Sequence, residues 1–328
     1  MKLSVLGAGA WGTALAANWA PHHEVTLWGR NTAELDAMRV SRVNARYLPG
    51  CALPDTLHLN PDFNAVVDGA ELIVIAVPSG GLRPTLAALA ARPGLPPLIW
   101  VCKGFEPGSR KLPHQLIAEL LPAHAQTGAL SGPSFAQEVA HGYPTALTLA
   151  SHDTVLAQRL AEALSSHRMR IYAHDDVIGV EVGGALKNVM AIAAGICDGL
   201  QLGLNARAAL ITRGLAEMTR LGIRLGGHFE TFMGLSGLGD LILTTTGDLS
   251  RNRQVGLRLA RGQALESILT ELGHVAEGVT TAREVAVLAG ELGVDMPITR
   301  AVCQMLFDGL PATQAVDALL NREIKAEF

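Results

Sequence analysis

The strongest constraint on the fold is a glycine-rich turn that follows the first apolar run of the chain. The run KLSVLG at 2–7 is typical of a β-strand, and it leads into GAGAWG at 7–12, which opens a helical pattern. This is the G-x-G-x-x-G spacing in the strand–turn–helix context of a dinucleotide site. Gly7 permits the tight turn, Gly9 lets a pyrophosphate approach the backbone, and Gly12 lets helix and strand pack closely. The sequence therefore predicts a dinucleotide-binding start, with a purely structural turn as the alternative.

The two halves of the chain differ in their pattern. Up to about residue 174, short β-type runs alternate with helical patterns, which favours a mostly parallel sheet with crossover helices. From about Asp176 onward long helical patterns dominate. We predict an α/β Rossmann-like domain with a mostly parallel sheet over 1–176, followed by an all-α domain over 177–328. The expected strands are 2–7, 23–29, 71–78, 96–104, 128–132, 144–151 and 169–173, and the longest expected helices are 177–200, 204–224, 251–261, 280–292 and 297–307.

Composition excludes several classes of protein. The 328 residues are 49% hydrophobic and 17% charged, with a net charge of −4, so we expect a globular chain that does not bind nucleic acid. The four cysteines are far apart, which favours a cytoplasmic location and neither a disulfide framework nor a metal site. Glu181, Lys187 and Asp198 interrupt the apolar run near residue 190. We therefore expect no membrane-spanning helix and no stable membrane insertion.

The end of the second expected strand indicates which nucleotide is bound. An Asp or Glu there would hold a ribose 2′-hydroxyl, as NAD sites prefer. This chain has Trp28, Gly29, Arg30 and Asn31 instead. The guanidinium of Arg30 suits a 2′-phosphate, so the sequence predicts that NADPH is bound and preferred, with NADH also accepted. An arginine on a solvated loop is the alternative.

Two of the five lysines lie where chemistry is expected. Lys187 sits inside an apolar helical pattern rich in Gly and Ala, where partial desolvation would lower its pKa. Such a lysine can donate and accept a proton near neutral pH, although a snorkelling or ion-paired lysine would look the same. Lys103 ends the strand pattern LIWVCKG, at the C-terminal edge of a parallel sheet where ligands bind. An ordinary surface lysine at a strand end is the alternative there.

Another polar cluster lies further along the chain. Asp240 follows the glycine-rich GLSGLG, and its carboxylate could orient a lysine or a bound hydroxyl. Ser250 is placed as the N-cap of an amphipathic run that stops at Gly262. Arg251 and Asn252 then fall in the first helical turn, where free N–H groups, a hydroxyl, a guanidinium and an amide predict a phosphate site. A plain helix cap with solvated arginines is the alternative.

Several long and specific segments carry a resemblance to one family. They are GAGAWGTALA (7–16), VPSGGLR (77–83), CKGFE (102–106), LSGPSFAQEVAHGYPTA (130–146), EVGGALKNVMAIAAGICDGL (181–200), GLSGLGDLILTTTGDLSRNR (234–253) and VAEGVTTA (275–282). In these segments, which span nearly the whole chain, it resembles the bacterial NAD(P)-dependent sn-glycerol-3-phosphate dehydrogenases. Two positions depart from the family pattern: Ala10 stands where many members have Ser, and Asn31 where many have a second Arg.

The resemblance implies reversible reduction of dihydroxyacetone phosphate to sn-glycerol 3-phosphate, for phospholipid synthesis, by a homodimer with a Rossmann-like and a helical domain. It implies that Lys187 is the acid/base group and that Lys103 and Asp240 lie at the reacting end. The implied substrate-binding positions are Lys103, Gly132, Ser134, Lys187, Asp240, Ser250, Arg251 and Asn252. The implied cofactor-binding positions, beside Gly7, Gly9 and Gly12 of the motif, are Ala10, Trp11, Arg30, Lys103, Ala136, Arg251, Val275 and Glu277.

Two rival functions remain at this point. One is a related dehydrogenase acting on a β-hydroxy acid or ketopantoate, because a substrate carboxylate could also use Arg251. Turnover of a phosphorylated or of a carboxylated keto-substrate would discriminate them. The other is a non-catalytic NADPH-binding sensor, which would bind cofactor without turnover and would have no need of the two lysines.

Overall fold

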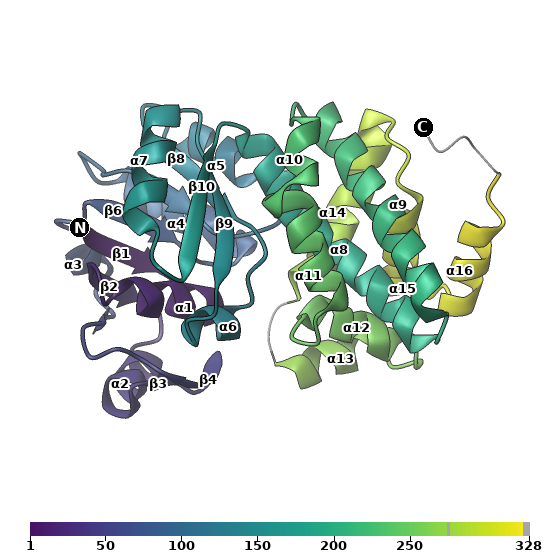
Figure 1. Cartoon of the computed structure of the whole chain (residues 1–328), viewed down its shortest axis with the longest axis horizontal. Coiled ribbons are helices and arrows are strands. Elements are labelled where there is room, and N and C mark those ends of the chain that lie inside the picture. The colour runs from purple at the N-terminus through teal and green to yellow at the C-terminus, as the bar shows by residue number, and fades with distance from the viewer. Residues whose placement is uncertain (274–275, 324–328) are drawn as a thin grey trace. The chain divides into compact units, whose positions relative to one another are not determined.

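The chain divides into two compact units. The structure is a computed structural model that describes residues 1–273 and 276–323. Unit 1 comprises Met1–Glu106 and Lys111–Glu181, and unit 2 comprises Pro107–Arg110 and Val182–Phe328. Figure 1 shows a sheet with helices in unit 1 and packed helices in unit 2. The predicted fold class, a Rossmann-like α/β part followed by a helical part, is confirmed.

Unit 1 is built on an eight-stranded sheet. Its strands are β1 (Lys2–Leu6), β2 (Glu24–Trp28), β5 (His58–Asn60), β6 (Leu72–Ile75), β7 (Leu98–Trp100), β8 (Thr127–Ser131), β9 (Thr145–Ala150) and β10 (Met169–His174). Their order is β10-β9-β8-β7-β6-β1-β2-β5, and all neighbours are parallel except β8 and β9. Because the order reverses at β1, the crevice at its carboxyl end is where such sheets bind ligands.

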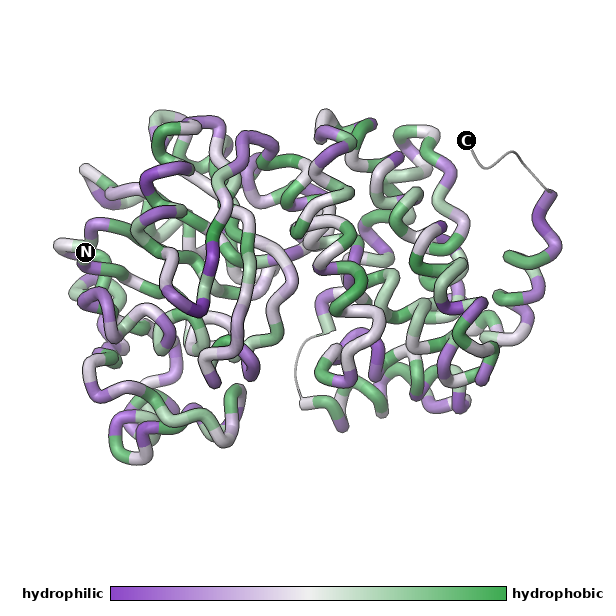
Figure 2. Tube along the Cα trace, in the orientation of Figure 1, coloured by the Kyte–Doolittle hydropathy of each residue, from purple (hydrophilic) through white to green (hydrophobic). Residues whose placement is uncertain are grey.

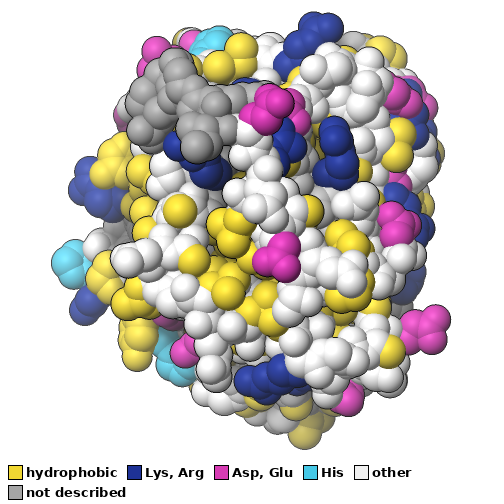
Figure 3. Space-filling view, turned by 90° about the vertical axis from the view of Figure 1, so that its right-hand side faces the viewer, with side chains coloured by type: hydrophobic (Ala, Val, Ile, Leu, Met, Phe, Trp, Pro, Cys, Tyr) yellow, Lys and Arg dark blue, Asp and Glu magenta, His cyan; other side chains and the backbone are white. Residues whose placement is uncertain are grey.

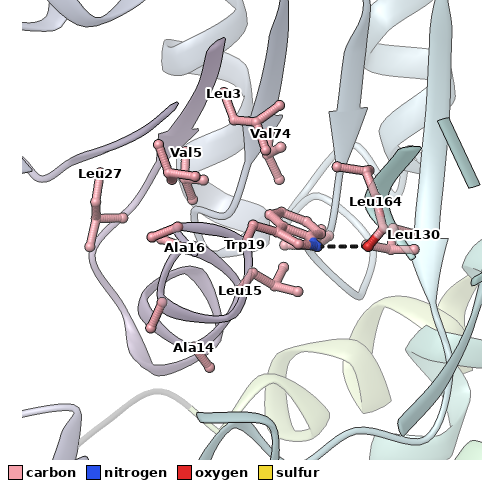
Figure 4. Packing of buried hydrophobic residues seen from close by; sticks show 14 of the residues in the cluster. Leu3, Val5, Ala14, Leu15, Ala16, Trp19, Leu27, Val74, Leu130 and Leu164 are labelled. Carbon is pink, nitrogen blue, oxygen red and sulfur yellow. Dashed lines mark hydrogen bonds between the residues drawn. The ribbon is translucent and has the colours of Figure 1, made fainter. Parts of the chain in front are cut away.

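Helices and two hydrophobic clusters cover this sheet. The helices are α1 (Ala10–Trp19), α2 (Thr32–Ser41), α3 (Phe63–Val67), α4 (Ser79–Ala90), α5 (Pro113–Leu120), α6 (Ala136–Ala140) and α7 (Thr154–Leu164). Leu3 and Val5 of β1 belong to one cluster and Leu6 to the other, as expected when alternate side chains face opposite sides. On the first side α1 packs against β1, and Trp19 Nε1 donates to Leu164 O at 3.1 Å (Figure 4). Burial on both sides explains why the strand sequences are continuously apolar.

Three short strands were not predicted. They are β5 and the separate antiparallel hairpin of β3 (Val43–Asn44) and β4 (Leu48–Ala52). These strands are two to five residues long, and β4 contains Pro49 and Gly50, which are rare inside strands. The expected strands at 71–78 and 96–104 are also shorter than their apolar runs, which continue into loops.

Unit 2 is organised around one buried helix. Its elements are α8 (Val177–Gly199, whose first turn lies in unit 1), α9 (Gly203–Arg224), α10 (Phe229–Met233), the π-helix η1 (Leu235–Gly239), α11 (Asp240–Thr246), α12 (Arg251–Leu259), α13 (Leu265–Leu272), α14 (Glu277–Leu292), α15 (Pro297–Phe307) and α16 (Ala312–Leu320). Every residue of α8 from 179 to 197 is buried. Figure 2 shows hydrophobic stretches recurring along the helices of unit 2. The helix predicted to stop at Gly262 ends at Leu259, and Gly262 follows with a φ of +78°.

The charged residues of α8 do not by themselves exclude a membrane-spanning helix. By length and composition α8 could cross a membrane, with a mean hydropathy of 1.5 over its most apolar window. However, 94% of that window is buried inside the protein, as in the core helix of a globular unit. Its charged residues have partners inside the protein: Glu181, for example, accepts a hydrogen bond from His114 N at 2.9 Å.

A short loop within the sequence of unit 1 belongs to unit 2. Residues 107–110 interrupt unit 1 between Glu106 and Lys111. Gly108 N donates to Glu284 Oε1 of α14 at 3.1 Å, and Arg110 pairs with Glu291 of the same helix at 3.0 Å. Unit 2 therefore includes a segment that lies far from the rest of it in the chain.

A buried carboxylate joins α9 to the start of α15. Glu217 accepts hydrogen bonds from Ile298 N at 2.6 Å, from Thr299 N at 3.1 Å and from Thr299 Oγ1 at 3.0 Å. These N–H groups belong to the first turn of α15, where no intrahelical acceptor exists. Burial is the largest effect on this carboxyl and raises the pKa of Glu217 above its usual value of 4.5.

Replacing Glu217 by Gln should change how stability depends on pH. The folded state holds the Glu217 proton more tightly than the unfolded chain does, so the contribution of this group is complete below its ordinary pKa and declines as pH rises above it. In urea unfolding between about pH 4 and pH 8, the wild type should lose stability relative to Glu217→Gln as pH rises. A difference in unfolding free energy between the wild type and Glu217→Gln that stays constant across this pH range would contradict the raised pKa of Glu217.

Candidate cofactor and substrate sites

Of the three glycines in the glycine-rich turn, only Gly9 faces open space, beside the start of α1. Gly7 has a φ of +128°, and a Cβ on it would lie 2.5 Å from Ala76 O. A Cβ on Gly12 would lie 2.1 Å from Gly7 O, whereas one on Gly9 would meet nothing within 4 Å. The first and third glycines are thus required by close packing inside unit 1. The second faces open space beside the N-terminus of α1, whose free N–H groups and positive dipole fit a pyrophosphate.

The other expected cofactor positions of unit 1 surround this turn. Ala10 and Trp11 form the start of α1, and Ala136 begins α6, which packs against α1. Arg30 is exposed two residues beyond β2, and within residues 1–273 and 276–323 its guanidinium has no hydrogen bond or ion pair. Asn31 instead caps α2, because its Oδ1 accepts from Glu34 N at 3.3 Å.

Lys103 and the Gly132–Ser134 loop lie together at the same edge of the sheet. They follow the neighbouring parallel strands β7 and β8. Lys103 Nζ donates to Gly132 O at 3.3 Å, and Ser134 Oγ donates to the same oxygen at 3.0 Å. Gly132 has a φ of +136°, and a Cβ there would lie 3.1 Å from Leu147 Cα. A glycine is therefore needed at the centre of this group.

In unit 2, Lys187 forms a buried ion pair with Asp240. Lys187 is 7% exposed and Asp240 is fully buried, and Nζ of the lysine donates to Oδ1 of the carboxylate. The close approach depends on Gly183, one turn earlier in α8, because a Cβ there would lie 2.3 Å from Ser236 O of η1. Burial without a partner would cost several kcal/mol per ion, so each of the two charges stabilises the other in this position.

The predicted phosphate site is the N-terminus of α12. Ser250 is confirmed as the N-cap, with its Oγ accepting from Arg253 N at 3.3 Å. Arg251 is exposed, and in the part of the chain that the structure describes its guanidinium makes no hydrogen bond or ion pair. An exposed guanidinium beside free helix N–H groups is suited to an anion.

Asn252 connects α12 to the helix that carries Lys187. Its Nδ2 donates to Asn188 Oδ1 at 2.9 Å, and its Oδ1 accepts from Gly278 N of α14 at 3.1 Å. Asn188 was not among the predicted site residues. Its place beside Lys187 in an apolar helix was the available signal, because a buried amide needs a partner.

Backbone contact and an ion pair hold α12 against α8. A Cβ on Gly195 would lie 2.1 Å from Arg253 O, and one on Gly256 would lie 2.0 Å from Ile192 O. Arg253 Nε and Nη2 both donate to Asp198 Oδ2, at 3.0 and 2.7 Å. These contacts, which no local sequence pattern indicates, fix the first turn of α12 relative to Lys187.

The remaining expected position in unit 2 is at the start of α14. Glu277 is the first residue of this helix and is half-buried. Val275 lies outside the described residues. Among the residues that are described, no group of three or more His, Cys, Asp or Glu is placed to hold a metal ion.

The fold and sites together are those of a dinucleotide-dependent oxidoreductase. The family models for the N-terminal and C-terminal parts of NAD-dependent glycerol-3-phosphate dehydrogenase match residues 2–157 and 176–317. The chain therefore belongs to the NAD-dependent glycerol-3-phosphate dehydrogenase family.

Relatives and solved structures agree with this assignment. The chain is 78% identical over the full length of both chains to a glycerol-3-phosphate dehydrogenase [NAD(P)+] of Thiobacillus denitrificans. It is 58% identical, again over the full length of both, to the protein of that name in Dechloromonas aromatica. The crystal structure of glycerol-3-phosphate dehydrogenase from Coxiella burnetii matches with a TM-score of 0.93 and 42% identity, over 98% of this chain and 99% of that one.

More distant enzymes share only the fold. A ketopantoate reductase from Ralstonia eutropha matches with a TM-score of 0.56 and 18% identity, over 98% of this chain and 100% of that one. Such a likeness carries no argument about substrate, so the rival carboxylate substrates gain no support from it.

Replacing Gly195 by Ala should displace α12. The added Cβ would meet backbone rather than a flexible side chain, so we expect a loss of about 1–3 kcal/mol in stability and weaker substrate binding. Gly290→Ala in α14 is the matched control, because a Cβ there meets nothing within 4 Å. It should be neutral or stabilising by up to about 1 kcal/mol. The melting temperature and the Michaelis constant for substrate are measured for both variants. Equal values in Gly195→Ala and Gly290→Ala would contradict the role assigned to Gly195.

Proposed function

We propose that this chain catalyses the reversible reduction of dihydroxyacetone phosphate to sn-glycerol 3-phosphate with NADPH or NADH. Membership of the family supports the reaction and the cofactor. The observation that carries the residue assignment is the buried ion pair of Lys187 with Asp240. The product would supply the backbone of glycerophospholipids.

Lys187 acts as the acid and base of the reaction in this proposal. When bound, the reduced nicotinamide supplies a hydride to the C2 carbonyl of the substrate. The Lys187 ammonium gives a proton to the oxygen as negative charge develops on it, and in the reverse direction the neutral amine takes the hydroxyl proton. Asp240 holds the ammonium in position. Lys103 adds a second positive charge that favours the alkoxide-like transition state.

The phosphate end of the substrate is assigned to the start of α12. Ser250, Arg251 and Asn252 supply a hydroxyl, a guanidinium and an amide beside free helix N–H groups, and Gly132 and Ser134 form a further substrate-binding loop. Binding energy at this non-reacting end orients the carbonyl for hydride transfer. A carboxylated substrate would offer fewer oxygens to these donors than a phosphate does.

The cofactor is assigned to the carboxyl edge of the sheet in unit 1. The glycine-rich turn and the start of α1, where Ala10 and Trp11 are, would hold its pyrophosphate. The family resemblance assigns further cofactor-binding positions to Lys103 and Ala136 in unit 1 and to Arg251, Val275 and Glu277 in unit 2, of which Val275 lies outside the described residues. Arg30 gives a preference for NADPH, and Asn31, which caps α2, adds no second charge.

We also propose that the protein is a cytoplasmic homodimer. Unit 2 exposes large hydrophobic side chains, among them Leu204, Ile223 and Phe229, which are 71%, 51% and 53% exposed. Figure 3 shows hydrophobic side chains exposed among charged ones on one face. Such side chains favour association with another protein surface where they form a contiguous patch, and sedimentation velocity distinguishes a dimer from a monomer.

Replacing Lys187 by Ala should abolish turnover and leave cofactor binding intact. The wild type is expected to oxidise NADPH, and NADH less efficiently, when dihydroxyacetone phosphate is added. Loss of the proton donor should lower kcat by about a thousandfold, while NADPH titration by fluorescence is unchanged. Lys111→Ala, which removes a lysine paired with Glu119, is the control and should keep wild-type turnover. Near-normal turnover of Lys187→Ala would refute the assignment.

Replacing Arg251 by Ala should mainly weaken binding. Removing one charge-assisted contact to phosphate is expected to raise the KM of dihydroxyacetone phosphate by about 10–100-fold. Arg261→Ala, at an exposed arginine just beyond the same helix, should leave it unchanged. If Michaelis constants for substrate and cofactor both stay at wild-type values in Arg251→Ala, the phosphate site lies elsewhere.

A further inference from the structure

A buried asparagine outside the motif contacts the glycine-rich turn directly. Asn44 belongs to β3, in the hairpin that the sequence analysis did not predict, and it is 3% exposed. Its Nδ2 donates to Ala8 O at 3.0 Å and to Thr13 Oγ1 at 2.9 Å. Its Oδ1 accepts from Tyr47 N at 3.1 Å. The side chain thus joins the hairpin, the turn and α1 through three hydrogen bonds.

The bond to Ala8 determines how the next N–H is aimed. The Ala8–Gly9 peptide is planar and trans, so the Ala8 carbonyl and the Gly9 N–H point in opposite directions. Because Asn44 holds the carbonyl on the side of the hairpin, the Gly9 N–H faces away from it. Among the described residues this N–H donates no hydrogen bond, and a Cβ on Gly9 would meet nothing within 4 Å.

The residue type at this position follows from the bonds it makes. One side chain must donate to a carbonyl and a hydroxyl while accepting from a backbone N–H, and a carboxamide has both kinds of group. Aspartate has nearly the same shape, but its carboxylate only accepts hydrogen bonds. It would therefore face the Ala8 carbonyl oxygen as acceptor against acceptor, and the hydrogen bond would be lost. The hairpin itself is held by Arg42, whose Nη2 donates to Pro54 O and to Leu57 O.

We propose that Asn44 is a positioning residue of the cofactor site, fixing the Ala8–Gly9 peptide so that its N–H is presented to the pyrophosphate. This rests on the proposed use of NADPH or NADH. Glycine permits close approach in the turn but leaves it flexible. The hydrogen bond from Asn44 restricts the conformation of the turn before the cofactor binds. This preorganisation favours binding, because less conformational entropy is lost when the complex forms.

The test is Asn44→Asp, measured with ligands that do or do not contain a pyrophosphate. We expect the KM of NADH and the inhibition constant of ADP against NADH to rise about tenfold, the effect of one lost hydrogen bond. The inhibition constant of adenosine, the KM of dihydroxyacetone phosphate and kcat at saturating NADH should stay at wild-type values. Asn44→Ser, which is uncharged and too short to reach Ala8, should show the same pattern and serves if the aspartate variant does not fold.

Arg42→Met is the matched control for loosening of the hairpin. This substitution removes the hydrogen bonds from Arg42 to Pro54 O and Leu57 O but leaves the bonds of Asn44 to the glycine-rich turn in place. The inhibition constants of ADP and adenosine should therefore stay at wild-type values. Unchanged ADP inhibition in the Asn44 variants, or equal weakening of ADP and adenosine, would overturn the positioning role. A wild type that oxidises neither NADPH nor NADH when dihydroxyacetone phosphate is added would instead refute the proposed function, so the two failures are distinguishable.

Discussion

Backbone-to-backbone contact around α8 is the constraint on which unit 2 depends. Glycines on α8 and on its neighbours let η1, α12 and α14 approach the helix within van der Waals distance of its main chain. Side chains at such an interface can change rotamer, but backbones in contact cannot adjust without moving whole helices. The position of Lys187 is therefore set by the packing of several helices rather than by its own side-chain conformation.

This packing also determines which polar groups α8 can carry. A helix buried along nearly its whole length has no water to satisfy polar side chains, so each must find a partner on a neighbouring element. Lys187 pairs with Asp240, Asn188 with Asn252, and Asp198 with Arg253. The same interior that makes the helix apolar enough to resemble a membrane span thus connects Lys187 and its neighbours on α8 to α11 and α12 through paired polar side chains.

How much could be predicted depended on whether the signal was local. The glycine-rich turn identified the Rossmann-like sheet, and Ser250 was recognisable as a helix cap, because both are set by residues close in sequence. The bonds of Asn44 to Ala8 and Thr13 and of Asn188 to Asn252 could not be predicted, since these partners lie more than 30 residues away in the sequence. The hairpin that carries Asn44 was missed because its strands are short and contain Pro49 and Gly50. For α8, the partners that bury its charges lie on other elements and were not visible in the sequence.

The short loop at 107–110 has a consequence for how the chain is made. Gly108 bonds to Glu284, 176 residues later, so unit 2 is not a continuous stretch of sequence. During synthesis this loop leaves the ribosome well before its partner helix exists, and the second unit can be completed only after α14 has emerged. Contacts of such long range also slow folding. A gene fragment that begins at α8 would lack this loop, so the helical half moved between proteins as a single contiguous piece would lose the contacts with Glu284 and Glu291.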